Sequence, residues 1–247
     1  MWIHKLLDLI FIPNGRCPIC LRVIFFSDDF VCHDCDRKLE VVRGNRCKKC
    51  GKEIEEEKNY CSDCISNPYH YEKGYCLYNY EGSIRKIIHD IKFSNCPDLA
   101  VYMGKKLGLS LQHCRWIHEV DRIIPVPLHK NRMKTRGYNQ SEKISWGIMQ
   151  SFVERQKPPN MILELECLVR EKDTPHQLEL KKDERFYNVK KAFAVIDEEV
   201  IKEKVVLLID DVYTTGATID ACSQTLMKSG AKKVYFATLA SVKKILR

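Results

Sequence analysis

Two adjacent carboxylates and a Thr-Thr-Gly turn lie together near the C-terminal end of the chain. In the stretch VVLLIDDVYTTGAT, residues 205–218, Asp210 and Asp211 follow five apolar residues directly. This apolar run is short and rich in β-branched residues, which is typical of a central parallel strand buried on both faces. Apolar residues at helical spacing follow from Ala217, and Gly230 is placed to cap that helix at its C-terminus. The stretch therefore predicts a strand that ends at Asp210, then a loop, then a helix.

This order of elements is typical of an anion site. In an open α/β sheet, ligands lie beyond the carboxyl ends of the strands, where the next helix presents free N–H groups. Thr214, Thr215 and Thr218 offer hydroxyl donors, and Gly216 lets the backbone approach a ligand closely. The two acids would repel a phosphate, but they suit ribose hydroxyls, and a divalent cation could offset their charge. We therefore predict a ribose 5-phosphate site, the alternative being a helix N-cap with incidental acids.

Eight of the thirteen cysteines form four CxxC pairs in the first 64 residues. Two such pairs place four thiolates around one zinc ion, so four pairs predict two structural zinc ions. The gaps between the pairs are 11, 11 and 10 residues, which leaves both sequential and interleaved pairing open. A dithiol redox role is the alternative, but it normally uses one CxxC at a helix start. With sequential pairing, which we favour, one ion is bound by Cys17, Cys20, Cys32 and Cys35, and the other by Cys47, Cys50, Cys61 and Cys64.

Length and composition predict two units in a cytoplasmic protein. The 247 residues suffice for a small zinc-binding module with a short N-terminal helix, residues 1–70, and an α/β domain, residues 71–247. Reduced cysteines and metal indicate the cytoplasm. The apolar start is too short for a signal peptide, and no other stretch approaches the length of a membrane span, so we expect no membrane insertion.

The middle of the chain predicts an alternation of helices and strands. YEGSIRKIIHDIKF, from Tyr80, has four isoleucines on one helical face, and a second helix is expected over about 99–113. A strand is expected at 122–127, a helix from about Gln140, and further strands at 162–170 and in KAFAVI.

A basic loop is expected between the strand at 122–127 and the helix at Gln140. Its bases are Lys130, Arg132, Lys134 and Arg136, with His129 as a conditional fifth. A solvated basic turn is the usual explanation of such a run. Its position after a strand end makes an anion site the more attractive interpretation.

Residues 205–218 resemble the phosphoribosyl pyrophosphate (PRPP) motif of type I phosphoribosyltransferases. No Gly-Lys-Ser/Thr follows, so a Walker NTPase is disfavoured. The resemblance implies a parallel sheet flanked by helices, with Asp210 and Asp211 on the ribose and Mg²⁺ accompanying PRPP. It places the basic loop, with Lys130 and Arg132, at the pyrophosphate, and a closing loop where Arg170, Gln177 and Arg185 lie. The residues that it assigns to the 5-phosphate are Thr214, Thr215, Gly216, Ala217 and Thr218.

Five features together resemble the competence protein F (ComF) family. They are the cysteine module, the YEG-x-I-R helix, PVPLHKNRMKTRGYNQ, the R-x6-Q-x7-R spacing from Arg170 to Arg185, and IDDVYTTGAT. This resemblance implies a role in natural transformation, in which imported single-stranded DNA is handled in the cytoplasm. A competence helicase is a possible partner of the zinc module.

Two functions follow from these predictions. The first is an enzyme of nucleotide metabolism or salvage that transfers ribose 5-phosphate from PRPP, with Asp210, Asp211, Arg170 and Arg185 as catalytic residues. The second is a PRPP-binding module that handles single-stranded DNA, which the formal charge of +8 favours. In the second case, Lys130, Arg132, Lys134 and Arg136 contact phosphates, and bases stack on some of Tyr69, Tyr71, Tyr75, Tyr78 and Tyr80. The alternative for these residues is solvated lysines and core tyrosines.

Overall fold

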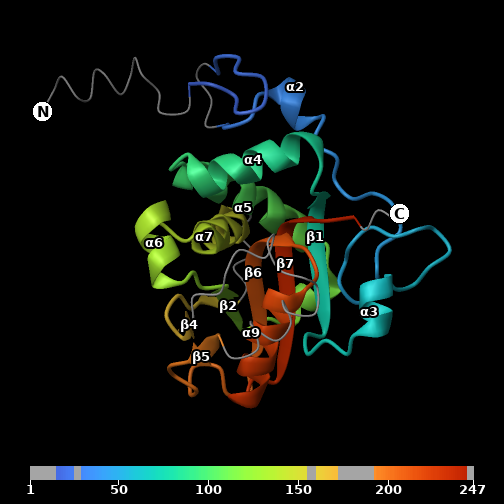
Figure 1. Cartoon of the computed structure of the whole chain (residues 1–247), viewed down its shortest axis with the longest axis vertical. Coiled ribbons are helices and arrows are strands. Elements are labelled where there is room, and N and C mark those ends of the chain that lie inside the picture. The colour runs from blue at the N-terminus through green and yellow to red at the C-terminus, as the bar shows by residue number, and fades with distance from the viewer. Residues whose placement is uncertain (1–14, 25–28, 155–159, 172–191, 244–247) are drawn as a thin grey trace, which may run out of the picture.

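A computed structural model describes residues 15–24, 29–154, 160–171 and 192–243 of the chain (Figure 1). Its helices are α2 (His33–Asp36), α3 (Ser62–Ser66), α4 (Gly82–Phe93), α5 (Pro97–Leu111), α6 (Lys130–Arg136), α7 (Gln140–Glu154) and α9 (Ala217–Lys228), with a 3-10 helix η1 (Arg115–Glu119). Its strands are β1 (Lys73–Asn79), β2 (Arg122–Pro125), β3 (Ile162–Leu163), β4 (Leu168–Arg170), β5 (Phe193–Val195), β6 (Val205–Tyr213) and β7 (Lys233–Ser241).

The strands form a five-stranded parallel sheet in the order β1-β7-β6-β2-β3. The helices α4, α5 and α7 pack on one face, and α9 packs on the other (Figure 1). The run from Val205 to Ile209 is fully buried because β6 lies between two strands and under helices on both faces. The predicted α/β sheet flanked by helices is confirmed, as are the helices expected after Tyr80, at 99–113 and from Gln140.

The basic segment that we expected as a loop contains the helix α6. At its start, the His129 ring nitrogen accepts a hydrogen bond from the Asn131 N–H, and at its end Gly137 adopts the left-handed conformation of a C-cap. The helix has no buried residue. Apolar periodicity, the signal that marked the other helices, is therefore absent from this one.

Two strand predictions also differ from the structure. Residues 162–170 form two short strands: β3 extends the main sheet, whereas β4 pairs with β5 in a separate antiparallel sheet. In addition, β6 does not end at Asp210 but continues to Tyr213. Both acids therefore belong to the last part of the strand.

The eight cysteines of the CxxC pairs form two groups in the sequential pairing. In each group the four sulfur atoms lie within 4.8 Å of one another. The Cys20 and Cys32 sulfurs are 3.7 Å apart, as are those of Cys50 and Cys61. A tetrahedral site with zinc–sulfur bonds of about 2.3 Å has edges of about 3.8 Å, so both groups fit structural zinc.

The two cysteine groups pack on opposite faces of the sheet. Cys17 and Cys35 of the first group join the buried cluster that contains α4 and α5. Cys47, Cys50 and Cys61 of the second join the cluster under α9. The expected N-terminal helix lies outside the described residues, and the module boundary near residue 70 stays a prediction.

The purified protein should contain close to two zinc ions per chain. A strong chelator should unfold the cysteine module but not the whole sheet, because structural zinc supplies much of the folding free energy of a module with a small core. Metal analysis combined with far-UV circular dichroism before and after chelation measures both effects. Metal-free protein with the eight thiols in disulfides would contradict this prediction.

Candidate functional site

The acids of β6 lie at the carboxyl edge of the sheet, where one neighbouring strand stops. β2 ends at Pro125, opposite Ile209, whereas β7 accompanies β6 as far as Tyr213. Asp210 and Asp211 therefore border the segment that leads from β2 into α6. Among the residues that the structure describes, no helix is both long and apolar enough to cross a membrane.

A cleft of about 310 Å³ opens at this edge. It brings residues from distant parts of the chain together, namely the acids, the Thr-Gly turn and three arginines. The predicted site residues that line it are Asp210, Asp211, Thr214, Gly216, Thr218, Arg132, Arg136 and Arg170. Thr215, Ala217, Lys130 and Lys134 do not line it, although Lys134 lines an adjoining hollow of about 390 Å³. Arg185 and Gln177 lie outside the described residues.

The acid pair is held by groups from two helices. Lys92, in the last turn of α4, places its ammonium nitrogen 2.6 Å from an Asp211 carboxylate oxygen. The Ser141 hydroxyl, in the first turn of α7, donates to Asp210 over 3.1 Å, and the Asp211 N–H donates to the same Asp210 oxygen over 2.9 Å. Burial and the neighbouring charge of Asp211 raise the pKa of Asp210 to about 7, although Lys92 and Ser141 oppose this shift.

Lys92 is a functional-site residue that the sequence analysis did not identify. Burial, the largest single effect, would lower the pKa of its ammonium, but the charge of Asp211, the hydrogen bond to Asp211 and the charge of Asp210 together raise that pKa. In the sequence, this lysine is one of the basic residues off the isoleucine face of its helix. The signal available in the sequence was the position of Lys92 at the end of its helix. A helix that packs along a parallel sheet can end beside the carboxyl edge of the sheet, where ligands bind.

The Thr-Thr-Gly turn leads directly into α9. Gly216 has φ of +83°, and a Cβ there would lie 2.5 Å from the Tyr213 hydroxyl oxygen. The turn therefore requires glycine for its backbone conformation and for space. The Thr215 hydroxyl accepts from the Ala217 N–H over 3.5 Å and so helps to satisfy the start of α9, although the N-cap residue itself is Gly216. Capping does not account for the acids, because they face Lys92 and Ser141 instead of the helix.

The tyrosines that we considered as stacking platforms are mainly core residues. Tyr69, Tyr71 and Tyr78 are buried, with 7%, 0% and 3% exposure. Tyr75 lies beneath the Arg46 guanidinium, and Tyr80 contacts Arg85 in the same way. The core interpretation is therefore correct for the three buried rings, which leave no face for a base.

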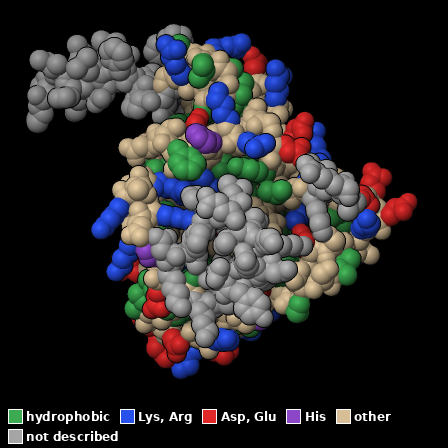
Figure 2. Space-filling model, viewed as in Figure 1, with side chains coloured by type: hydrophobic (Ala, Val, Ile, Leu, Met, Phe, Trp, Pro, Cys, Tyr) green, Lys and Arg blue, Asp and Glu red, His purple; other side chains and the backbone are tan. Residues whose placement is uncertain are grey.

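One aromatic side chain that lines the cleft near Arg136 is exposed. Phe93 lines both the cleft and the adjoining hollow, and it is 61% exposed. The Arg136 guanidinium lies 5.6 Å from its ring centre and donates to the Gln140 side chain. Burial lowers the pKa of Arg136, although that residue keeps its charge. Figure 2 shows several Lys and Arg side chains on the side of the molecule where α6 lies.

Replacing Asp210 by Asn should stabilise the ligand-free protein more at pH 8 than at pH 5. The pKa of Asp210 is raised in the folded state, to about 7. The stability that its proton contributes is therefore complete below the unfolded-state pKa of about 4 and is lost as the pH rises towards 7. Thermal melts at the two pH values test this, with a shift of about 2–4 °C for each kcal/mol.

The exposed change Glu198→Gln is the control for a general loss of negative charge. An equal effect of Asp210→Asn at both pH values would show that the surroundings do not raise the pKa of Asp210.

Comparisons with known proteins agree with these observations. The family model of the double zinc ribbon domain matches residues 6–65. Competence protein F of Haemophilus influenzae is 27% identical over 225 residues, which are 90% of this chain and 94% of that protein. DNA utilization protein YhgH of Escherichia coli O6:H1 is 27% identical over 223 residues, 89% of this chain and 94% of that protein.

Among solved structures, a purine phosphoribosyltransferase from Pyrococcus horikoshii covers 58% of this chain and 71% of its own, with 17% identity and a TM-score of 0.31. The alignments with these sequence relatives cover most of both chains. The chain is therefore homologous, along about nine tenths of its length, to competence protein F, and the family resemblance of its motifs is confirmed.

Proposed function

We propose that the cleft binds PRPP together with Mg²⁺. The observation that carries this proposal is that the acid pair, the Thr-Gly turn and three arginines line one cleft. In this mode Asp210 and Asp211 accept hydrogen bonds from the ribose hydroxyls. The 5-phosphate lies at the turn and the start of α9, where backbone N–H groups and the helix dipole favour an anion. Arg132, Arg136 and Arg170 face the pyrophosphate, whose charge suits guanidinium groups.

The ion pair between Lys92 and Asp211 fits this mode. Two adjacent carboxylates repel each other, and a single ammonium at 2.6 Å offsets one of the two charges. Mg²⁺ carried by PRPP would offset the other. Lys92 thereby keeps the acids together in the ligand-free protein and leaves a site that favours a metal-bound polyphosphate over a free anion.

We further propose that single-stranded DNA binds beside the PRPP cleft. The adjoining hollow is lined by Arg132, Lys134 and Arg136, and the exposed Phe93 lies between it and the cleft. Basic side chains that follow a phosphate backbone and an aromatic ring for a base are the usual elements of single-strand binding. Two relatives are named competence protein F and DNA utilization protein, which supports a role with DNA. This role includes the handling of imported DNA in the cytoplasm.

An active phosphoribosyltransferase is the second candidate. Its support is the same arginine group, because guanidinium groups opposite the acid pair would stabilise pyrophosphate as it leaves. The experiment on PRPP distinguishes the two candidates, since only the enzyme consumes it.

Calorimetric titration with PRPP and Mg²⁺ should show binding that the double change Asp210→Asn/Asp211→Asn weakens about a hundredfold or more. Each charged hydrogen bond to the ribose is worth about 1.5–3 kcal/mol. Thr218→Val should weaken binding less, because it removes one donor. The matched control is Glu198→Gln/Glu199→Gln, two adjacent exposed acids outside the cleft.

Equal affinity of the native chain and the double variant would disprove the PRPP site. Release of pyrophosphate with any nucleobase or nucleic acid would favour the enzyme. Binding without consumption would favour the module that handles DNA.

Changing Lys130, Arg132, Lys134 and Arg136 together to Gln should weaken single-stranded DNA binding and flatten its salt dependence. For each phosphate that the variant no longer neutralises, the slope of log K against log salt should fall by about 0.7. Phe93→Leu should instead lower affinity by about 1–3 kcal/mol per stacked base and leave the slope unchanged. Fluorescence anisotropy with labelled oligonucleotides over a range of salt concentrations measures both.

The control variant changes four lysines at the opposite end of the sheet to Gln, namely Lys202, Lys204, Lys228 and Lys232. It removes the same total charge. If it reduces the slope as much as the first variant does, then the net charge and not the surface at α6 governs DNA binding.

A further inference from the structure

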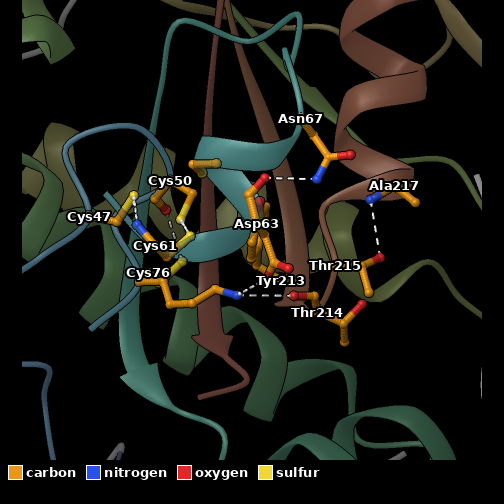
Figure 3. A network of polar contacts seen from close by, with 12 residues as sticks. Cys47, Cys50, Cys61, Asp63, Asn67, Cys76, Tyr213, Thr214, Thr215 and Ala217 are labelled. Carbon is orange, nitrogen blue, oxygen red and sulfur yellow. Dashed lines mark hydrogen bonds and ion pairs between the residues drawn. The ribbon is translucent and has the colours of Figure 1, made fainter. Parts of the chain in front are cut away.

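Two buried side chains beside the second cysteine group donate hydrogen bonds to the backbone carbonyls of the Thr214–Thr215 turn. Lys52 is 3% exposed, and its ammonium lies 3.1 Å from the Asp63 carboxylate and donates to the Thr214 carbonyl over 3.4 Å. The Tyr69 hydroxyl donates to the Thr215 carbonyl over 2.7 Å. Figure 3 shows Asp63 between the cysteines of the second group and the turn residues Thr214 and Thr215.

These two bonds fix the direction of two successive peptide groups. In a trans peptide, the C=O of one residue and the N–H of the next point in opposite directions, and the described chain has no cis bonds. Because the carbonyls of Thr214 and Thr215 point to the cysteine module, the N–H groups of Thr215 and Gly216 point away from it. Successive N–H groups in such a turn form an anion-binding nest. Lys52 and Tyr69 thus orient the donors that the proposed phosphate site needs.

The Lys52 contact originates beside zinc ligands, and Tyr69 follows the ligand Cys64 by five residues. Lys52 follows Cys50 by two residues, and Asp63 lies between Cys61 and Cys64. The Cys64 sulfur is 3.9 Å from the Tyr71 hydroxyl, which in turn is 2.8 Å from the Tyr213 hydroxyl. The Tyr213 ring also lies 5.3 Å from the Lys52 ammonium. The second zinc site is therefore connected to both ends of the turn, whereas the first packs with α4 and α5 on the other face of the sheet.

We infer that zinc at the second cysteine group, with Lys52 and Tyr69 as positioning residues, sets the backbone of the phosphate turn and so its affinity for the 5-phosphate of PRPP. The affinity part of this inference rests on the proposed function. Loss of the second zinc ion releases the turn, and loss of the first does not.

Hydrogen exchange of residues 213–218, measured without ligand, tests the positioning directly. Lys52→Met and Tyr69→Phe should each accelerate exchange of this segment at least tenfold while the chain keeps two zinc ions. The control Lys58→Met changes an exposed lysine of the same module, paired with Glu55, and should leave exchange unchanged. Native exchange in both variants would overturn the inference.

Two single changes test the part played by the metal. Cys64→Ser at the second site should accelerate exchange of residues 213–218, and Cys20→Ser at the first site should not. An equal effect of both changes would overturn the specific link to the second zinc. If Cys64→Ser does not fold, Lys52→Met with both zinc ions bound still decides the question.

PRPP titration then separates this inference from the proposed function. A native chain that does not bind PRPP would disprove the proposed function, while faster exchange in Lys52→Met would still support the positioning of the turn. Tight PRPP binding by Lys52→Met, equal to that of the native chain, would overturn the inferred effect on affinity.

Discussion

The repulsion between two adjacent carboxylates, and its relief by one ammonium, is the constraint on which the cleft depends. Asp211 is almost fully buried, so its charge requires a partner, and Lys92 supplies it at 2.6 Å. Removing one partner of a buried pair typically costs about 3–5 kcal/mol. The ion pair therefore joins the end of α4 to the end of β6. The four buried isoleucines of α4 hold that helix against the sheet in the register that brings Lys92 to the acids.

Local patterns in the sequence predicted the parts of the site that are continuous in the chain. The strand, turn and helix around residues 205–218 could be predicted because burial, glycine conformation and helical spacing each act over a few residues. The spacing of the CxxC pairs left the zinc pairing open, and only the folded chain shows the sequential groups. Likewise, the partnership of Lys92 with Asp211 depends on the packing of α4 across the sheet, which no local pattern encodes. The helix α6 was not predicted because none of its residues is buried and its sequence therefore lacks apolar periodicity.

Aromatic residues illustrate a further limit of sequence patterns. The run that includes Tyr69, Tyr71 and Tyr78 suggested rings available to bases, but all three are buried. Their hydroxyl groups decide their role: Tyr69 donates to a turn carbonyl, and Tyr71 meets Tyr213. A buried tyrosine needs a partner for its hydroxyl, and that partner lies more than a hundred positions away in the sequence in both cases. Only the folded chain shows that these residues support the turn.

The contact between Lys52 and the Thr214 carbonyl limits how the two parts of this chain could have been exchanged during evolution. A gene fusion that replaced the cysteine module alone would also replace Lys52 and Tyr69, which donate to the carbonyls of the turn. A foreign module with perfect zinc ligands would leave the carbonyls of Thr214 and Thr215 without these donors unless it carried matching residues. Recombination between distant relatives near residue 70 would thus produce chimeras that bind metal and form the sheet but carry a mismatched turn. The module and the turn are expected to change together in a lineage, as two surfaces of one interface.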